Sequence, residues 1–481
     1  MLLFPGPPAQ QAGKTRESKR MPVRCRRSQA RSGSLSLSWL LCMALVVACL
    51  GAGCLFFAHQ VRGLFTRPFQ TAIFGWDDTF YYVWLRSAFI GGDVDFTDDV
   101  ASSPSLPRRL KMEVLRGPRT EKGLIPNKYP VGWALSSAPF YLMADSTVTL
   151  ANAAGGCAIS HDGNGPVYQF VILLGQLLYA LAGLLLCFLI LRRFLPVEPV
   201  IVGIGLTWVG SFLFYYQTVD LTMAHSTTFF WIVLTYYLVL LIDDKPERAR
   251  YWPMLGIAAG MVILSRYQAA AYLLFPAVVA LRAVVARKAR VAPLLLAAGL
   301  FAGVLFIQMA AWRALYGHWL LYTYSETFDW FNPHLPEVLF SPFHGLYYWH
   351  PILLLATVGF VAGVATIREI PRSWLVVLFA TIWINAAWSC WWFAASFGSR
   401  AFEGCMLFFM AGSAWIIARL WRRKALLGLV VALYLLAAAW NLNLAWLVNE
   451  NVIPGDRPVT WRQMASTTLR YYAPPNPPPR E

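Results

Sequence analysis

The residues best suited to chemistry are two adjacent carboxylates, Asp77 and Asp78, inside the segment Gly75–Arg86. Helix starts favour an acidic cap, and either carboxylate could fill that role. Capping uses one carboxylate only. The second would then lie at a membrane surface beside aromatic side chains, whose low dielectric raises a carboxyl pKa and suits proton transfer. The pair therefore predicts one structural acid and one acid for proton transfer.

Three cations, Lys128, Arg266 and Arg400, interrupt apolar sequence and could hold a phosphate. Arg266 stands between two apolar runs, where a charge is costly unless it is paired or faces water. Arg400 begins a helix after Gly398, which would let the backbone approach a ligand, and helix starts attract anions. Structural alternatives stay open for each cation: a snorkelling lysine at 128, a carboxylate partner for Arg266, and an Arg400–Glu403 salt bridge.

The histidines carry weaker signals. His225 lies five positions after Asp220, so the two do not share one helix face, and an interhelical hydrogen bond is the simpler role for this imidazole. The loop Arg313–Tyr348 is rich in Tyr, His and Trp, which suits sugar stacking and equally an interfacial aromatic belt. No acidic or imidazole pair there has the spacing of a helical metal site, so neither a metal nor another cofactor is predicted.

The elements that must position these residues are membrane helices, since 58% of the 481 residues are hydrophobic and only 13% are charged. Residues 1–34 are predicted to form a basic, disordered cytoplasmic tail, and Leu37–Ala58 is long enough to cross a bilayer. Ten further apolar runs follow: Val167–Leu191, Val200–Tyr216, Thr222–Ile242, Pro253–Leu264, Ala269–Val285, Val291–Trp312, Leu346–Ile367, Trp374–Trp392, Ala401–Ala418 and Ala425–Val448.

The positions of the basic residues predict an all-α polytopic protein with about eleven spans, a cytoplasmic N-terminus and an outer C-terminus. The net charge of +16 is therefore mostly a topology signal and does not indicate nucleic acid. Val131–Ala144 would be a half-buried or in-plane element on the outer face, and the segment after Asp78 an amphipathic helix on the membrane surface. The predicted organisation is a transmembrane domain 35–448 with outer loops 59–166 and 313–345, then an outer tail 449–481 with a Pro-rich end.

This arrangement resembles the polytopic GT-C glycosyltransferases, and within them the branch of protein O-mannosyltransferases and lipid A aminoarabinose transferases. The resemblance rests on one span before a large outer loop that begins with Asp77-Asp78, and on a Lys128-Tyr129-Pro turn before a short apolar helix. Gly345–Pro351 and Ser396–Arg400 are similar to motifs in uncharacterised bacterial members.

The resemblance implies that a sugar on a polyprenyl phosphate is transferred, with inversion, to a lipid, glycan or protein hydroxyl. The reaction would occur on the outer face of a bacterial inner membrane. Asp77 would be the general base and Asp78 its neighbour, although Glu is common at the second position. Cations would stabilise the departing phosphate. The implied substrate-binding residues are Lys128, Tyr129, His225, Arg266, His350 and Arg400.

Two other classes of function stay open. A transporter or lipid flippase for cell-envelope glycolipids would use the same cations along a translocation path, but such proteins usually carry midplane charges and repeated halves. A ligase or a lipid-binding membrane component would not need the acidic pair. Convergence of Asp77, Lys128 and Arg400 in one outer cavity would favour the enzyme.

Overall fold

The computed structural model describes residues 37–473 except 67–70, 74 and 156–157. The predicted disordered tail 1–34 and most of the Pro-rich end lie outside the described residues. Within them the chain is all helical, and the only β pairing is an isolated bridge between Phe328 and Trp388. The predicted all-α class is confirmed.

Seven helical segments among the described residues are long and apolar enough to cross a membrane. The pair α7 (Val197–Val209) and α8 (Phe212–Thr218) adds an eighth if counted as one span bent by 77°. Three shorter apolar helices, α10 (Tyr251–Ser265), α15 (Ile352–Thr366) and α16 (Ser373–Ala387), overlap the remaining predicted runs, so eleven crossings stay a prediction. The seven are α1 (Leu37–Thr66), α6 (Pro166–Leu191), α9 (His225–Asp244), η2 (Tyr267–Leu273) with α11 (Leu274–Val285), α12 (Val291–Tyr316), η3 (Arg400–Cys405) with α17 (Met406–Leu420), and α18 (Lys424–Asn449).

Helix α2 (Gly75–Arg86) corrects one prediction, because it does not lie on the surface with one face exposed. Every residue from Asp78 to Arg86 is buried. Its polar side chains tolerate burial because they have partners: Thr79 hydrogen-bonds Ser105 at 2.6 Å, and Arg86 contacts the acidic residues 98 and 99 of helix α3 (Thr97–Ser102) at 2.8 and 2.6 Å. A π-helical turn, η1 (Ser87–Gly91), joins α2 to this region, and the more exposed α4 (Arg108–Arg116) follows.

Helix α5 (Gly132–Ala153) is longer than the 14-residue apolar segment predicted there, since it runs for 22 residues and includes Pro139. It packs against α2 and α6, and Gln176 of α6 donates to the Ser137 hydroxyl at 2.8 Å. Helix α5 is not one of the seven segments that are long and apolar enough to cross a membrane. The α5 start is therefore anchored to the bundle, which matters for the turn that precedes it.

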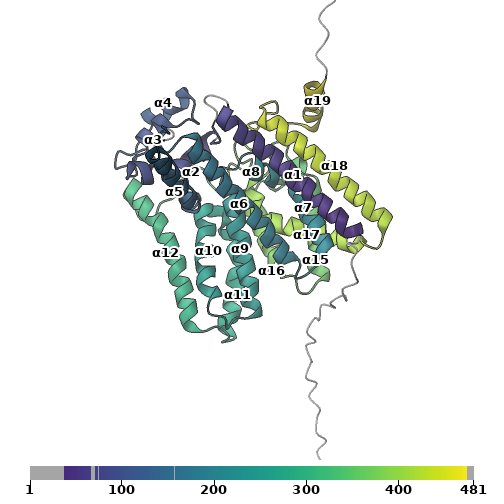
Figure 1. Cartoon of the computed structure of the whole chain (residues 1–481). Helices are drawn as coiled ribbons and strands as arrows, with labels where there is room; N and C mark the ends of the chain where they lie inside the picture. The colour runs from purple at the N-terminus through teal and green to yellow at the C-terminus, as the bar shows by residue number, and fades with distance from the viewer. Residues whose placement is uncertain (1–36, 67–70, 74, 156–157, 474–481) are drawn as a thin grey trace, which may run out of the picture.

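The C-terminal region also differs from the predicted tail. Helix α19 (Trp461–Tyr472) begins with a capping box between Thr460 and Gln463, so the described part of the predicted outer tail contains a helix. The second outer loop contains α13 (Leu335–Phe340) and α14 (Leu346–Trp349). Helices α3, α4 and α19 lie toward the same end of the bundle (Figure 1).

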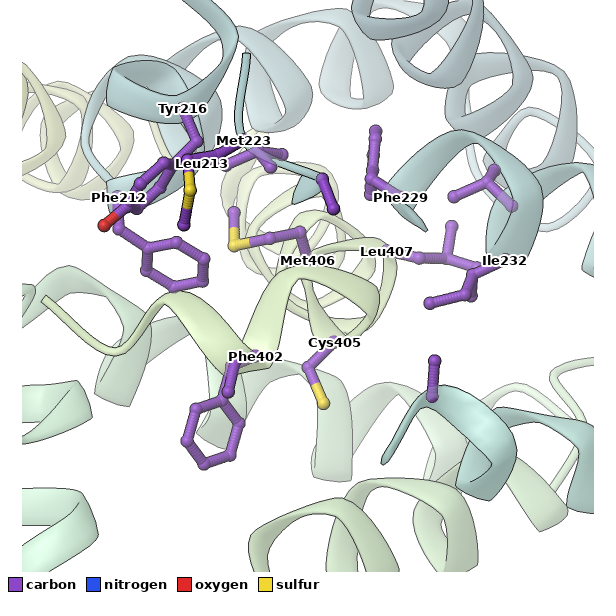
Figure 2. Packing of buried hydrophobic residues seen from close by; sticks show 14 of the residues in the cluster. Phe212, Leu213, Tyr216, Met223, Phe229, Ile232, Phe402, Cys405, Met406 and Leu407 are labelled. Atoms are coloured by element: carbon purple, nitrogen blue, oxygen red, sulfur yellow. The ribbon is translucent and has the colours of Figure 1, made fainter. Parts of the chain in front are cut away.

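Helix α17 packs closely against α7 and α15. An added Cβ at Gly412 would lie 1.8 Å from the Ala356 carbonyl of α15, and one at Gly203 of α7 would lie 2.6 Å from the Ala414 nitrogen. Both contacts require glycine. Apolar side chains from α8, α9, η3 and α17 gather near the start of α17 (Figure 2). The backbone of η3 is therefore firmly positioned.

Candidate active site

The two carboxylates at the start of α2 occupy different environments. Asp78 is fully buried, accepts a hydrogen bond from the Thr222 hydroxyl at 2.5 Å, and hydrogen-bonds Asp220. The Asp77 side chain is 27% exposed and lines a cavity. Of the pair, Asp77 is thus the carboxylate that a molecule in the cavity can reach.

Asp77 is held by two donors from distant parts of the chain. The Tyr129 hydroxyl donates to Oδ1, and Arg400 Nη2 donates to Oδ2 at 3.0 Å. Burial acts to raise the pKa of Asp77, but Arg400, the Tyr129 hydroxyl, Arg266 and Lys128 outweigh it and bring the pKa below its usual value. The carboxylate is therefore anionic at neutral pH. The raised pKa expected from the sequence is wrong for Asp77, because the nearby cations and the tyrosine outweigh burial.

Tyr129 reaches Asp77 because the preceding turn is fixed from several sides. The Asn127 amide donates to the Phe80 carbonyl at 2.8 Å and accepts from the Tyr129 backbone N–H at 3.1 Å. The Trp84 indole donates to the Tyr129 carbonyl at 3.2 Å. At Gly132, an added Cβ would lie 2.2 Å from the Leu264 carbonyl, so glycine is needed for α5 to begin this close to α10. The position of Tyr129 is thus set by contacts of Asn127 before it, of its own backbone, and of Gly132 after it.

Lys128 points to a different carboxylate. Its Nζ lies 3.2 Å from Glu326 Oε1 and 5.1 Å from the centre of the Tyr324 ring. Its side chain is 31% exposed. Lys128 is therefore a paired cation beside an aromatic wall rather than a lysine that merely reaches toward water.

Arg266 and His225 form a second cluster with Glu403. Arg266 Nη1 lies 3.1 Å from His225 Nδ1, Arg266 Nε lies 3.6 Å from Glu403 Oε1, and His225 Nδ1 lies 3.5 Å from Glu403 Oε2. Arg266 thus has the carboxylate partner left open above. An Arg400–Glu403 salt bridge is not formed, because Arg400 pairs with Asp77 and Glu403 faces Arg266.

The structure places His350 apart from these clusters. Its ring packs against Gly398, where an added Cβ would lie 2.2 Å from His350 Nε2, and Gly398 has φ of +63°. The expectation that Gly398 admits a ligand is wrong, since an imidazole occupies that side. His350 lines a separate cavity of about 180 Å³ together with Trp440 and Asn441.

A larger cavity of about 690 Å³ opens beside Asp77 and Arg400. Its walls come from the start of α2, the loop between α8 and α9, the turn 394–400, and the end of α18 with the loop that follows it. The last of these is held in place because the Ser396 backbone N–H donates to the Gly455 carbonyl at 2.9 Å. We call this space the polar cavity; its polar side chains include Asp77, Asp220, Ser396, Arg400, Asn451, Asp456 and Arg457. The expected convergence of Asp77, Lys128 and Arg400 in one cavity is met only in part, because Lys128 does not line it.

A second, apolar space of about 250 Å³ lies on the side of Lys128 and Arg266, and we call it the aromatic cleft. Tyr324, over which Lys128 lies, forms one wall, and Tyr267, the neighbour of Arg266, forms another. The two rings meet edge to face at 6.1 Å. Further walls come from Gln268, Ala270, Ala271, Tyr322, Phe328, Trp330, Ile384, Asn385 and Trp388.

Residues 164–312 match the family model described as dolichyl-phosphate-mannose-protein mannosyltransferase. This match supports a GT-C type membrane glycosyltransferase. The matched part of the chain runs from α6 to α12 and includes His225 and Arg266, whereas Asp77, Lys128 and Arg400 lie outside it. No curated protein and no solved structure gives a significant match to the chain.

Several residues of the candidate site were not assigned roles in the sequence analysis. Glu326, Tyr324 and Asp220 have no diagnostic spacing, although the first two belong to the aromatic-rich outer loop that suggested sugar stacking. Trp76 directly precedes the acidic pair, and its exposed position is visible only in the fold. Among the described residues, no three His, Cys, Asp or Glu side chains are arranged to hold a metal ion.

Proposed function

We propose that this protein is an inverting glycosyltransferase that moves a sugar from a polyprenyl-phosphate donor to an acceptor hydroxyl on the non-cytoplasmic face of the membrane. The observation that carries the proposal is the direct contact of Asp77 with Arg400 at 3.0 Å. Lys128 and Arg266 add positive charge close enough to lower the Asp77 pKa. An anionic base thus stands next to a group of cations, as transfer from a phosphate requires.

In the proposed reaction the acceptor oxygen attacks the anomeric carbon from the side opposite the phosphate. The bond between that carbon and the phosphate oxygen breaks, and the phosphate leaves with the electron pair. Asp77 takes the proton of the attacking hydroxyl, so charge is balanced. Arg400, Arg266 and Lys128 stabilise the phosphate, where preorganised cations contribute most.

The aromatic cleft suits the lipid part of such a donor. Its walls are mainly aromatic and aliphatic; Lys128 lies over the ring of Tyr324 in one wall, and Arg266 directly precedes Tyr267 in another. An isoprenoid chain against Tyr324 and Tyr267 would place its phosphate near these cations and its sugar toward Asp77. Tyr129 contributes by fixing the Asp77 carboxylate through its hydroxyl.

The arrangement of basic turns supports an outward-facing site. Helix α9 begins at His225 and ends before Lys245, Arg248 and Arg250, and the η3–α17 segment runs from Arg400 to a turn with four basic residues. Both helices therefore lead from the site to a basic turn at the opposite end. Basic turns favour the cytoplasm, which puts the site on the other face. We assign the protein to a bacterial inner membrane because two of its motifs are similar to those of bacterial GT-C members.

The test is transfer by the full chain in liposomes, with a panel of polyprenyl-phosphate sugars and a mixture of hydroxyl acceptors. We expect product from at least one donor, and proton NMR should show the anomeric configuration inverted relative to that donor. Movement of lipid-linked sugar across the bilayer without any transfer would overturn the proposal in favour of a flippase. Product with retained configuration would overturn the role given to Asp77.

A further inference from the structure

We propose that the acceptor is a carbohydrate, bound in the polar cavity with Trp76 as its stacking surface. This inference rests on the proposed glycosyl transfer and adds the chemical class of the acceptor. Asp77 lines the polar cavity, which has no lining residue in common with the aromatic cleft. If the lipid donor occupies the cleft, the acceptor hydroxyl must approach Asp77 from the polar cavity.

Trp76 presents an aromatic face at that approach. It directly precedes Asp77, lines the polar cavity, and is 40% exposed. The centres of its ring and of the buried Phe80 ring are 5.1 Å apart, and this packing limits the motion of the indole. Sugars offer flat C–H faces that pack on aromatic rings and hydroxyls at their edges, so a ring on Trp76 would bring a hydroxyl toward the neighbouring carboxylate.

The rest of the cavity supplies the polar groups that sugar hydroxyls use. Asn451, Asp456 and Arg457 contribute acceptors and donors from the rim, and Asp220, which hydrogen-bonds Asp78, lies in the wall. Asp456 and Arg457 are exposed, and neither has a salt-bridge partner in the part of the chain that the structure describes. Because each sugar hydroxyl donates one hydrogen bond and accepts others, such mixed groups fit a polyhydroxylated ligand.

The same cavity fits other acceptors less well. Extended peptides are commonly held by a strand edge, and the described residues contain no strand to offer one. A lipid acceptor needs an apolar path, yet the rim carries Asp456, Arg457 and Asn451. The volume of about 690 Å³ lies within the range of small-molecule sites, so a short oligosaccharide can enter.

The experiment uses the full chain in liposomes with a polyprenyl-phosphate sugar that it consumes. Linear hexose and N-acetylhexosamine trisaccharides and a Ser/Thr-rich peptide are offered at equal hydroxyl concentration. We expect transfer to a trisaccharide and none to the peptide. Trp76→Ala should raise the KM for the trisaccharide about tenfold and leave the KM for the donor unchanged. Trp319→Ala is the matched control, since this indole is 46% exposed and lines neither space.

The outcomes separate this inference from the function on which it rests. Transfer that depends on Asp77 and reaches the peptide but no trisaccharide would overturn the carbohydrate assignment and leave glycosyl transfer standing. A Trp76→Ala variant that changes only the donor KM would do the same. Failure to consume any lipid-linked sugar would overturn the proposed function, and the acceptor class with it.

Discussion

Two charged clusters lie at the same end of the bundle, and they differ in access. Asp77 and Arg400 meet at the wall of the polar cavity, where the Asp77 side chain is 27% exposed. Glu403, one turn after Arg400 in η3, is 3% exposed and contacts Arg266 and a fully buried His225. Their chemical groups are alike. Exposure therefore distinguishes a carboxylate that can take a proton from a substrate from one that stabilises the fold.

We expect the largest effect on stability from removing the charge of Glu403, which contacts Arg266 and His225. Glu403→Gln leaves the Arg266 charge without its carboxylate in a buried place, and such a loss costs about 3–5 kcal/mol. We expect a clearly lower Tm in detergent for this variant, measured by thermal unfolding. Asp77→Asn is the comparison, and we expect a smaller loss of Tm, because the Asp77 side chain is 27% exposed whereas that of Glu403 is 3% exposed. The opposite order of the two Tm values would contradict the distinction.

The second largest effect is expected on the transfer rate, when Arg400, the cation paired with Asp77, is replaced. Arg400→Gln removes a donor from the proposed phosphate site, and losses of this kind reduce kcat by about 10²–10³. Arg400→Lys restores charge without the planar guanidinium, so we expect partial recovery. Transfer rates at saturating donor, with folded protein quantified, give the measurement. A wild-type kcat in Arg400→Gln would remove this residue from the reaction.

Asp220 gives a pH-dependent prediction for the cavity wall. Burial raises its pKa to about 6, against the lowering effects of its hydrogen bond to Asp78 and of Arg400. The folded state thus binds this proton more tightly than the unfolded state. The resulting stabilisation is complete below about pH 4 and is lost as pH rises through 6. Asp220→Asn should therefore gain stability relative to the wild type between pH 5 and pH 7, by at most about 3 kcal/mol. A constant Tm difference across that range would contradict the assignment.

The smallest effect is expected at Tyr129. Its hydroxyl lowers the Asp77 pKa, although burial is the larger influence and acts to raise it. Tyr129→Phe removes this donor, at a cost of about 1 kcal/mol. Because the base must be ionised, the acid limb of the kcat/KM profile should move to higher pH. A profile identical to that of the wild type would show that the contact does not tune the base.

The sequence predicted the long apolar helices well, because hydropathy and the positions of basic residues are local signals. It failed for α2, whose polar residues are satisfied by partners far along the chain; Thr222 is 144 positions from Asp78. It left a salt bridge between Arg400 and Glu403 open as an alternative, because the two are three residues apart. The structure pairs Arg400 instead with Asp77, 323 positions away, and a contact of that separation depends on packing between distant helices.

Asp77 tests the central claim most directly. Transfer from a polyprenyl-phosphate sugar should be measured for Asp77→Asn in liposomes, beside Glu113→Gln, a change at an exposed acid of α4. The general-base role predicts a loss of about 10²–10⁴ in the rate per folded molecule for Asp77→Asn, with wild-type activity in the control. An Asp77→Asn variant that transfers sugar at the wild-type rate would contradict the account.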